Sequence, residues 1–244
     1  MSTRPTAVEV DGVTKRFRLR HTHSLKESLV WAVQGKARHN DFCALDSVDL
    51  VVPQGQTMAL LGRNGSGKST LLKLMAGVMT PDEGRVRLRG RVAGLLEVGA
   101  GLHPDLTGRE NVFLNASILG MDEAQIRARF DDIVDFADIG QFLDTQVRFY
   151  SSGMFLRLAF AVAVHTEPDV FLVDEILAVG DEQFRRRCLE RIERLSAEGR
   201  TLVVVSHDLD LVERLCDRGV VLQQGKMIHD GDVAEAVRYL KAPA

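Results

Sequence analysis

The chain has 244 residues, which suits one large domain or one core with a smaller subdomain. Hydrophobic residues make up 45% of it, enough for a sizeable buried core, and its formal net charge is −3. This charge provides no overall basic field, so we expect no nucleic-acid partner. Three scattered cysteines without a CxxC pair argue against a disulfide framework or a zinc site and fit a reducing cytoplasm.

The apolar runs of the sequence are short. The longest covers residues 158–164, far below the ~20 residues that a membrane-spanning helix needs. We therefore expect a chain whose contact with a membrane is peripheral or made through a partner.

The first part of the chain alternates predicted strands with a glycine-rich loop. Strands are predicted at residues 8–13 and 45–52, where apolar and polar residues alternate. A short apolar strand at 57–61 leads into the loop, and a helix over 70–76 follows it and ends at Gly77. A turn and further alternation through Val86 and Leu88 predict another strand.

The middle of the chain is predicted to be helical. Thr107 and Glu110 have the spacing of a capping box and open a helix that runs to Leu119. Asp122 caps a second helix with one apolar stripe. That stripe consists of Ile126, Phe130, Ile133, Val134 and Ala137. The two helices predict a helical subdomain over residues 98–155.

The last part of the chain returns to apolar strands. They are predicted at residues 170–173 and 201–205, and a charged helix over 181–197 separates them. Apolar strands flanked by helices favour a parallel sheet that is covered on both faces.

A glycine-rich loop at residues 62–70 carries the clearest chemical signal. It reads Gly-Arg-Asn-Gly-Ser-Gly-Lys-Ser-Thr and fits G-x-x-x-x-G-K-[ST], in which backbone N–H groups and a helix dipole face phosphate oxygens. A plain glycine-rich turn would fit the composition too, but this match follows a predicted strand and opens a predicted helix. Lys68 would reach the β- and γ-phosphates of ATP, and Ser69 would ligate Mg²⁺. The residues expected to bind ATP are Gly62, Asn64, Gly65, Ser66, Gly67, Lys68, Ser69 and Thr70.

A second signal is the pair of carboxylates that follows the apolar strand at 170–173. Asp174 would hold Mg²⁺ through its water shell, and Glu175 would orient and polarise the attacking water. Acidic residues often end strands, so the pair alone leaves both interpretations open. Its combination with the glycine loop favours nucleotide hydrolysis, with Glu175 and Lys68 as catalytic residues.

A third motif separates families of nucleotide hydrolases. Residues 150–154 read Tyr-Ser-Ser-Gly-Met and stand ahead of a predicted helix, about twenty residues before Asp174. This resembles the signature of ABC proteins, usually Leu-Ser-Gly-Gly-Gln: Ser151 and Gly153 match, and the other three residues depart from it. A serine hydroxyl and free amides at a helix N-terminus suit a γ-phosphate, although an ordinary serine N-cap has the same sequence. The order and spacing of the three motifs favour the ABC signature.

The resemblance implies roles for four further residues. His207, directly after the strand at 201–205, matches a catalytic histidine that contacts the γ-phosphate. Asp181 resembles a residue of the loop that crosses the dimer interface and would take part in nucleotide binding. Phe17 stands where the family places an aromatic ring on adenine, and a core phenylalanine is an equal alternative. Glu97 is the nearest match to the family's glutamine between the subdomains and would sense Mg²⁺ or the attacking water.

The resemblance covers nearly the whole chain and implies an α/β fold: a P-loop NTPase core, a helical subdomain and an antiparallel β N-terminal part. The predicted organisation is one ABC ATPase domain over 1–244, with its core at 1–97 and 156–244, its helical subdomain at 98–155 and an insertion at 18–44.

Three stretches resemble one branch of the family: the signature, residues 96–104 and residues 107–111. This branch comprises the ATPase subunits of bacterial exporters of lipid-linked polysaccharide, namely O-antigen, capsule and teichoic acid. The insertion supports the same branch, because Ser24 opens a short amphipathic helix flanked by basic residues. This helix would meet the anionic lipid or the permease at the membrane face, or pack on its own domain with solvated charges.

The resemblance also implies partners. Two copies would form a homodimer beneath integral membrane permease subunits, at the cytoplasmic face of the bacterial inner membrane. ATP would then lie between the glycine loop of one copy and Ser151 and Gly153 of the other. An importer ATPase is the second interpretation. A non-transport ABC ATPase ranks lower, because it would need a long coiled-coil insertion or a second ATPase domain.

Overall fold

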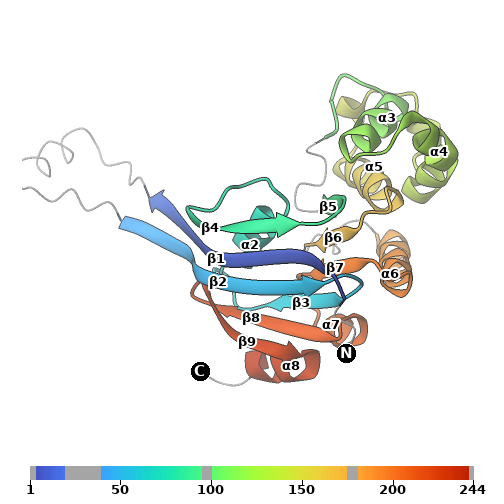
Figure 1. Ribbon diagram of the computed structural model, residues 1–244. Coiled ribbons are helices and arrows are strands. Elements are labelled where there is room, and N and C mark those ends of the chain that lie inside the picture. Colours follow the sequence, from blue (N-terminus) through green and yellow to red (C-terminus); the bar gives the residue numbers. More distant parts are fainter. Residues whose placement is uncertain (1–3, 20–39, 95–100, 175–180, 242–244) are drawn as a thin grey trace, which may run out of the picture.

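The computed structural model describes residues 4–19, 40–94, 101–174 and 181–241, whose strands form two sheets (Figure 1). The smaller sheet is antiparallel, with the strand order β2-β1-β4. Its strands are β1 (Thr6–Leu19), β2 (Asn40–Pro53) and β4 (Glu83–Leu88). The antiparallel N-terminal part implied by the family resemblance is therefore confirmed.

The larger sheet has the strand order β5-β6-β7-β3-β8-β9 and is parallel except for β9, its antiparallel edge strand. Its strands are β3 (Thr57–Leu61), β5 (Val92–Gly94), β6 (Val170–Val173), β7 (Thr201–Val204), β8 (Arg218–Gln223) and β9 (Lys226–Asp232). Since β3, β6 and β7 run in the same direction, their carboxyl ends lie at one edge of the sheet. In open α/β sheets this edge is where ligands bind.

Helices follow most of these strands in the chain. They are α2 (Lys68–Met75), α3 (Gly108–Ile118), α4 (Glu123–Ala137), α5 (Ser152–His165), α6 (Glu182–Ala197), α7 (Leu209–Leu215) and α8 (Val233–Lys241), with short 3₁₀ turns η1 (Gly140–Phe142) and η2 (Val147–Phe149). Within the described ranges, no helix combines the length and the apolar character that crossing a membrane requires.

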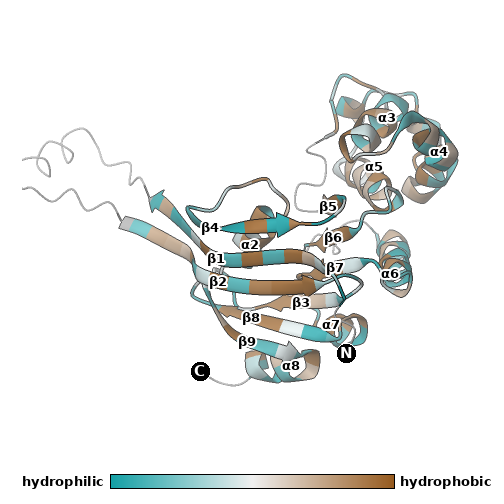
Figure 2. Ribbon diagram, viewed as in Figure 1, coloured by the Kyte–Doolittle hydropathy of each residue, from teal (hydrophilic) through white to brown (hydrophobic). Residues whose placement is uncertain are grey.

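Both faces of the larger sheet are buried. Along β3, Met58 and Leu60 join a hydrophobic cluster with α2 and the smaller sheet, whereas Ala59 and Leu61 join a cluster with α6, α7 and α8. Successive residues of a strand point to opposite faces, so each face of β3 packs against a different layer. Figure 2 shows hydrophobic residues gathered in strands of both sheets. The predicted parallel sheet covered on both faces is confirmed.

The helical part of the molecule stands beside the end of the larger sheet that carries β5 and β6 (Figure 1). Both predicted caps are present: Thr107 with Glu110, and Asp122 with Gln125, form capping boxes at the starts of α3 and α4. The buried side chains of α3 and α4 share one cluster with α5, which continues to Val162. The cluster thus extends past residue 155, where we placed the end of the helical subdomain.

Two elements differ in length from the prediction. The strands β1 and β2 remain paired as far as Leu19 and Asn40, so the predicted insertion at 18–44 starts and ends as a strand pair. Aromatic rings at opposite positions, Phe17 and Phe42, favour this longer pairing. The amphipathic helix predicted within the insertion falls on residues 20–39, outside the described part of the chain.

The helix α2 begins at Lys68 instead of Thr70, because Gly67 adopts a φ of 110° and turns the chain directly into the helix. At its other end, Val78 N–H donates to the Lys73 carbonyl at 3.1 Å and Gly77 N–H donates to the Leu74 carbonyl at 3.2 Å. This is a Schellman motif, which requires the positive φ of 72° at Gly77. The predicted stop at Gly77 is confirmed, one residue beyond the C-cap.

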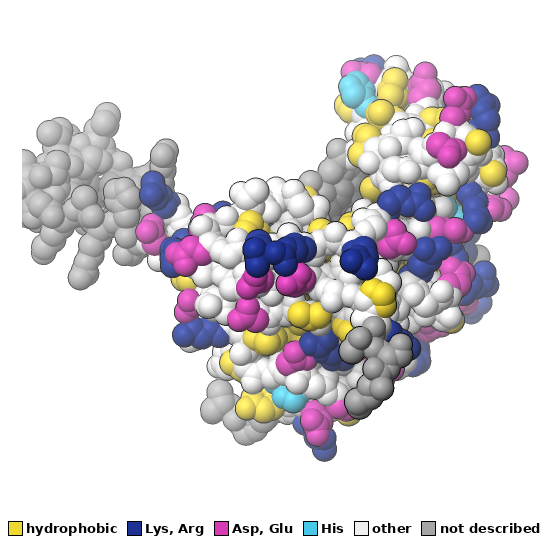
Figure 3. Space-filling view, in the orientation of Figure 1, with side chains coloured by type: hydrophobic (Ala, Val, Ile, Leu, Met, Phe, Trp, Pro, Cys, Tyr) yellow, Lys and Arg dark blue, Asp and Glu magenta, His cyan; other side chains and the backbone are white. Residues whose placement is uncertain are grey.

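The outer face of the smaller sheet carries charges of both signs (Figure 3). Cross-strand ion pairs join β1 to β4: Arg87 with Glu9 at 3.0 Å and Arg85 with Asp11 at 2.8 Å. Opposite charges facing each other across a strand pair stabilise its register. This face is therefore a solvated surface of paired charges.

Candidate active site

The glycine loop joins β3 to α2, and the close approach of the surrounding backbone determines its shape. Gly62 has a φ of 145°, and a Cβ there would overlap the carbonyl oxygen of Leu222 and the hydroxyl of Ser66. Gly67 has a φ of 110°, and its Cβ would lie 2.6 Å from the carbonyl oxygen of Ala44. Only glycine satisfies both the dihedral angle and the space at these two positions. The loop thus packs closely against the backbone of both β8 and β2.

The turn between β8 and β9 supports the loop from behind. Gly225 N–H donates to the Ser66 carbonyl at 3.0 Å, and the Gly225 carbonyl accepts from Asp46 N–H at 2.9 Å. This one residue therefore links the loop to β2, although all three segments are far apart in the sequence.

Lys68 is buried inside the curve of the loop, with 7% of its surface exposed. Its Nζ donates to the Gly62 carbonyl at 2.8 Å and to the Arg63 carbonyl at 3.3 Å. These bonds hold the ammonium group against the carbonyls at the start of the loop. A positive charge that is buried and positioned in this way attracts an anion strongly.

The N-terminus of α2 is built differently from that of its neighbours. The helices α3, α4, α5, α6 and α7 each begin with a side chain that accepts a backbone N–H, whereas α2 begins at Gly67 with no side-chain cap. The hydroxyl of Ser66 is also buried without a hydrogen-bond partner in the described part of the chain. Uncapped N–H groups, a helix dipole and an unpartnered hydroxyl together fit the phosphate groups of a nucleotide.

A pocket of about 380 Å³ lies over this helix N-terminus. Residues 64–70 line it together with Ala44 and Phe42, whose ring is half exposed. Phe17, which we predicted to stack on adenine, is not among the described residues that line this pocket; it lies opposite Phe42 across the β1–β2 pair. Sequence reasoning missed Phe42. The available signal was an aromatic residue on β2, the strand that neighbours the one carrying Phe17. Choosing Phe42 requires the register of the β1–β2 pair, which the sequence does not state.

His207 and Asp174 lie at the same edge of the sheet as the loop. His207 follows the carboxyl end of β7, and Asp174 follows that of β6. These two parallel strands pair with each other, and β7 also pairs with β3, which leads into the loop. His207 also lines a larger cavity of about 1030 Å³ together with loop residues 62–66. The fold therefore brings His207 and the loop together. Glu175 and Glu97 lie outside the described residues.

The residues that resemble the ABC signature form the start of α5. Ser151 is its N-cap, and its hydroxyl accepts the Met154 N–H at 3.2 Å. Gly153 lies in the first turn, where a Cβ would meet only the Ser151 hydroxyl, at 3.8 Å. Among the described residues, neither pocket that the glycine loop lines includes Ser151 or Gly153. In the described part of one chain, Ser151 and Gly153 are therefore separate from these two pockets.

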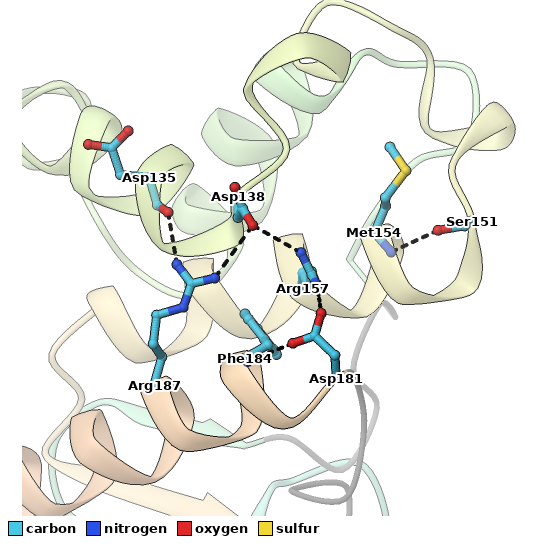
Figure 4. A network of polar contacts seen from close by, with 8 residues as sticks. All are labelled: Asp135, Asp138, Ser151, Met154, Arg157, Asp181, Phe184 and Arg187. Atoms are coloured by element: carbon cyan, nitrogen blue, oxygen red, sulfur yellow. Dashed lines mark hydrogen bonds and ion pairs between the residues drawn. The ribbon is translucent and has the colours of Figure 1, made fainter.

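Asp181 caps α6 by accepting the Phe184 N–H at 2.8 Å. This hydrogen bond, with the positive charges of Arg157 and Arg187, lowers the pKa of the Asp181 carboxyl. The carboxylate also contacts the guanidinium of Arg157, which lies on α5 (Figure 4). Asp181 is thus an ionised group joined to the helix that begins at Ser151.

The arrangement of strand, glycine loop, helix and adjacent strand-end carboxylate defines a nucleotide-binding α/β protein. Residues 45–178 match the family model of the ABC transporter, which is more than half of the chain. The chain belongs to the ABC transporter family and contains its ATP-hydrolysing domain.

The chain is 45% identical to the O-antigen export system ATP-binding protein RfbB of Myxococcus xanthus, over 94% of this chain and 54% of that protein. It therefore spans about half the length of that relative. It is 42% identical to an RfbB protein of Klebsiella pneumoniae, over 82% of this chain and 81% of that protein. A solved ATP binding subunit of an ABC transporter matches with a TM-score of 0.76 and 25% identity, covering 97% and 94% of the two chains. The predicted resemblance to ATPase subunits of polysaccharide exporters is confirmed.

Proposed function

We propose that this chain binds and hydrolyses ATP with Mg²⁺ to power an exporter of lipid-linked polysaccharide, of the O-antigen, capsule or teichoic acid type. The observation that carries the proposal is the uncapped N-terminus of α2 in a chain of the ABC family. Lys68 is buried there, and the Ser66 hydroxyl has no hydrogen-bond partner among the described residues. The names of its relatives, which are ATP-binding proteins of O-antigen export systems, support the transported class.

In this proposal the loop N–H groups and Lys68 bind the phosphates, and Phe42 or Phe17 covers the adenine. Ser69, at the second position of α2, and Asp174, after β6, offer the oxygen donors that Mg²⁺ prefers. When bound, Mg²⁺ would supply positive charge beside the phosphates. His207 would contact the γ-phosphate from its place in the adjoining cavity.

Two residues outside the described part of the chain complete the proposed chemistry. Glu175 would orient and polarise the attacking water, because it directly follows Asp174 at the phosphate edge of the sheet. Glu97, the nearest match to the family's glutamine between the subdomains, would sense Mg²⁺ or the attacking water.

The proposed unit of function is a homodimer beneath integral membrane permease subunits, at the cytoplasmic face of the bacterial inner membrane. Support for the dimer comes from the separation of Ser151 from the pockets of its own glycine loop. A second copy would supply Ser151 and Gly153 to complete each site. The hydroxyl of Ser151 already accepts an N–H, and it retains its own hydrogen for donation to a phosphate.

The variant Glu175→Gln tests the proposed function. We expect it to bind ATP, to dimerise tightly in ATP and to hydrolyse almost none, because the amide cannot polarise water. Turnover, and the dimer fraction by size-exclusion chromatography, are measured for both proteins. Turnover equal to that of the wild type would remove Glu175 from its role.

A second experiment tests the transported class. The wild-type chain with its permease should move lipid-linked polysaccharide in proteoliposomes only with ATP, and ATP-independent movement would contradict the proposal.

A further inference from the structure

Arg157 lies between two acidic residues from different helices (Figure 4). Its Nη1 is 3.3 Å from a carboxylate oxygen of Asp138, at the end of α4, and its Nη2 contacts Asp181, at the start of α6. The arginine side chain is 19% exposed, while those of Asp138 and Asp181 are 66% and 56% exposed. One largely buried guanidinium on α5 thus joins the ends of two other helices.

The two carboxylates are held by the backbone around them. Asp138 ends α4 in a left-handed conformation with a φ of 54°, and its N–H donates to the Val134 carbonyl at 3.0 Å. Asp181 accepts the Phe184 N–H and so has a defined rotamer at the N-cap of α6. Because both acids are fixed at helix ends, their contacts with the same arginine set the distance between the end of α4 and the start of α6.

A second arginine and three aromatic rings enclose this junction. Arg187 of α6 lies 3.6 Å from the Asp138 carboxylate and donates to the Asp135 carbonyl at 3.4 Å. The guanidinium of Arg157 lies 5.4 Å from the centroid of the Phe184 ring. The Phe136, Phe160 and Phe184 rings also pack on one another at the junction, with centroids 5.7–6.0 Å apart. Rings that exclude water on one side strengthen the ionic contacts on the other.

We propose that Arg157 is a positioning residue that fixes Asp181 relative to Ser151. Ser151 is the N-cap of α5, and Arg157 lies six residues later on the same helix, about 9 Å along its axis. Ser151 and Arg157 keep a fixed separation because they belong to the same helix, and the ion pair fixes Asp181 relative to Arg157. The two residues that would face the partner's nucleotide therefore keep one relative geometry. This inference rests on the proposed function, because it assigns a role in the shared site.

A purely structural role for Arg157 would make the variant Arg157→Met unstable, whereas a positioning role leaves its folding unchanged. The carboxylates of Asp138 and Asp181 are mostly exposed, so water solvates them when the arginine is removed, and the ion pairs add little to folding stability. Methionine has an unbranched side chain that retains much of the aliphatic part of the arginine without its charge. The variant Arg157→Met should consequently fold and bind ATP like the wild type, since the glycine loop is untouched.

The test is a double-mutant cycle on ATP hydrolysis by the full chain. We expect Arg157→Met to lower kcat by about tenfold through misplaced groups, with the dissociation constant for ATP unchanged. Asp181→Asn keeps a helix cap but loses the charge, and it should lower kcat similarly. The double variant should be no slower than the slower single variant, because both break one link. Arg157→Lys, which retains the charge but not the two-pronged contact, should be intermediate.

Arg127→Met is the matched control, because Arg127 forms an exposed ion pair with Glu123 within α4. Its kcat should remain within about twofold of the wild type, as expected for a surface pair. Hydrogen exchange gives a readout that does not depend on turnover. The first turn of α6, residues 182–186, should exchange faster in Arg157→Met and at the wild-type rate in Arg127→Met.

Additive effects of Arg157→Met and Asp181→Asn, or an unchanged kcat in Arg157→Met, would overturn the positioning role. Equal exchange of residues 182–186 in Arg157→Met and the wild type would overturn it as well. A wild-type chain that does not hydrolyse ATP would instead contradict the proposed function, and the exchange comparison would still decide whether Arg157 holds the start of α6.

Discussion

The starts of α2 and α5 are both helix N-termini with expected roles in binding one nucleotide, yet they are built in opposite ways. The N-cap of α2 is Gly67, which offers no side-chain cap, and the first residue of the helix is the buried Lys68. The helix α5 begins at Ser151, whose hydroxyl already accepts the Met154 N–H. The first leaves its N–H groups for an external anion, and the second presents a hydroxyl held in place. In the proposed shared site we therefore expect α2 to supply most of the binding energy, and α5 mainly to position a hydroxyl group.

The largest expected effect comes from removing the charge at α2. Lys68→Met should reduce ATP turnover by more than about a hundredfold, because it removes a positioned cation from the developing phosphate charge. Steady-state hydrolysis at saturating ATP measures this. Lys73→Met, in the last turn of the same helix, is the matched control and should retain activity. If both variants hydrolyse ATP equally well, α2 is not the principal phosphate site.

The second prediction compares one glycine from each helix start. Gly67→Ala should destabilise the fold by about 2 kcal/mol, because alanine is strained at a φ of 110° and its Cβ meets the Ala44 carbonyl. Gly153→Ala should instead stabilise it by about 0.5 kcal/mol, since this glycine lies in a helical turn with open space around it. Urea unfolding of the two variants and the wild type measures both values. The same sign of change in both would show that the two starts are constrained alike.

The smallest expected effect concerns pH at the junction of α5 and α6. The Phe184 N–H, with Arg157 and Arg187, lowers the pKa of Asp181 below the ordinary 3.8. A carboxyl whose pKa is lower in the folded state stabilises the fold above its unfolded pKa, and this stability is lost as the pH falls through the folded value. Asp181→Asn should thus flatten the acid side of the stability profile only slightly, because the group is exposed.

Thermal unfolding between pH 7 and pH 3 would measure that slope. Asp131→Asn, an exposed acid on α4 outside the junction, is the control and should follow the wild-type profile. A slope for Asp181→Asn as steep as that of the wild type would show that the α6 cap carries no charge-dependent stability.

Local signals predicted much of this fold. The capping box at Thr107, the cap at Asp122 and the glycine stop at Gly77 each lie within a few residues of sequence, and the structure confirms all three. The two-sided burial of β3 follows from its short apolar run, which is typical of a strand inside a parallel sheet. The glycine loop was placed from its pattern alone, and the structure adds the reason for two of its glycines.

Long-range contacts explain what the sequence left open. The position of Phe42 beside the glycine loop depends on the pairing of β1 with β2, and no local pattern states that register. The contact of Arg157 with Asp138 and Asp181 joins three helices, so it follows only from their packing. Because charged residues on helices are usually solvated, the sequence alone did not predict that Arg157 would contact two acidic residues.

The support that Gly225 gives the glycine loop has a consequence for biosynthesis. The loop leaves the ribosome well before the hairpin that bonds to Ser66 and Asp46, because that hairpin follows it much later in the chain. The earlier half of the chain therefore emerges without the backing that shapes its loop. Contacts between distant segments form late in folding, because closing such long spans is entropically costly. A nascent chain consequently acquires a finished nucleotide site only after this hairpin has been made.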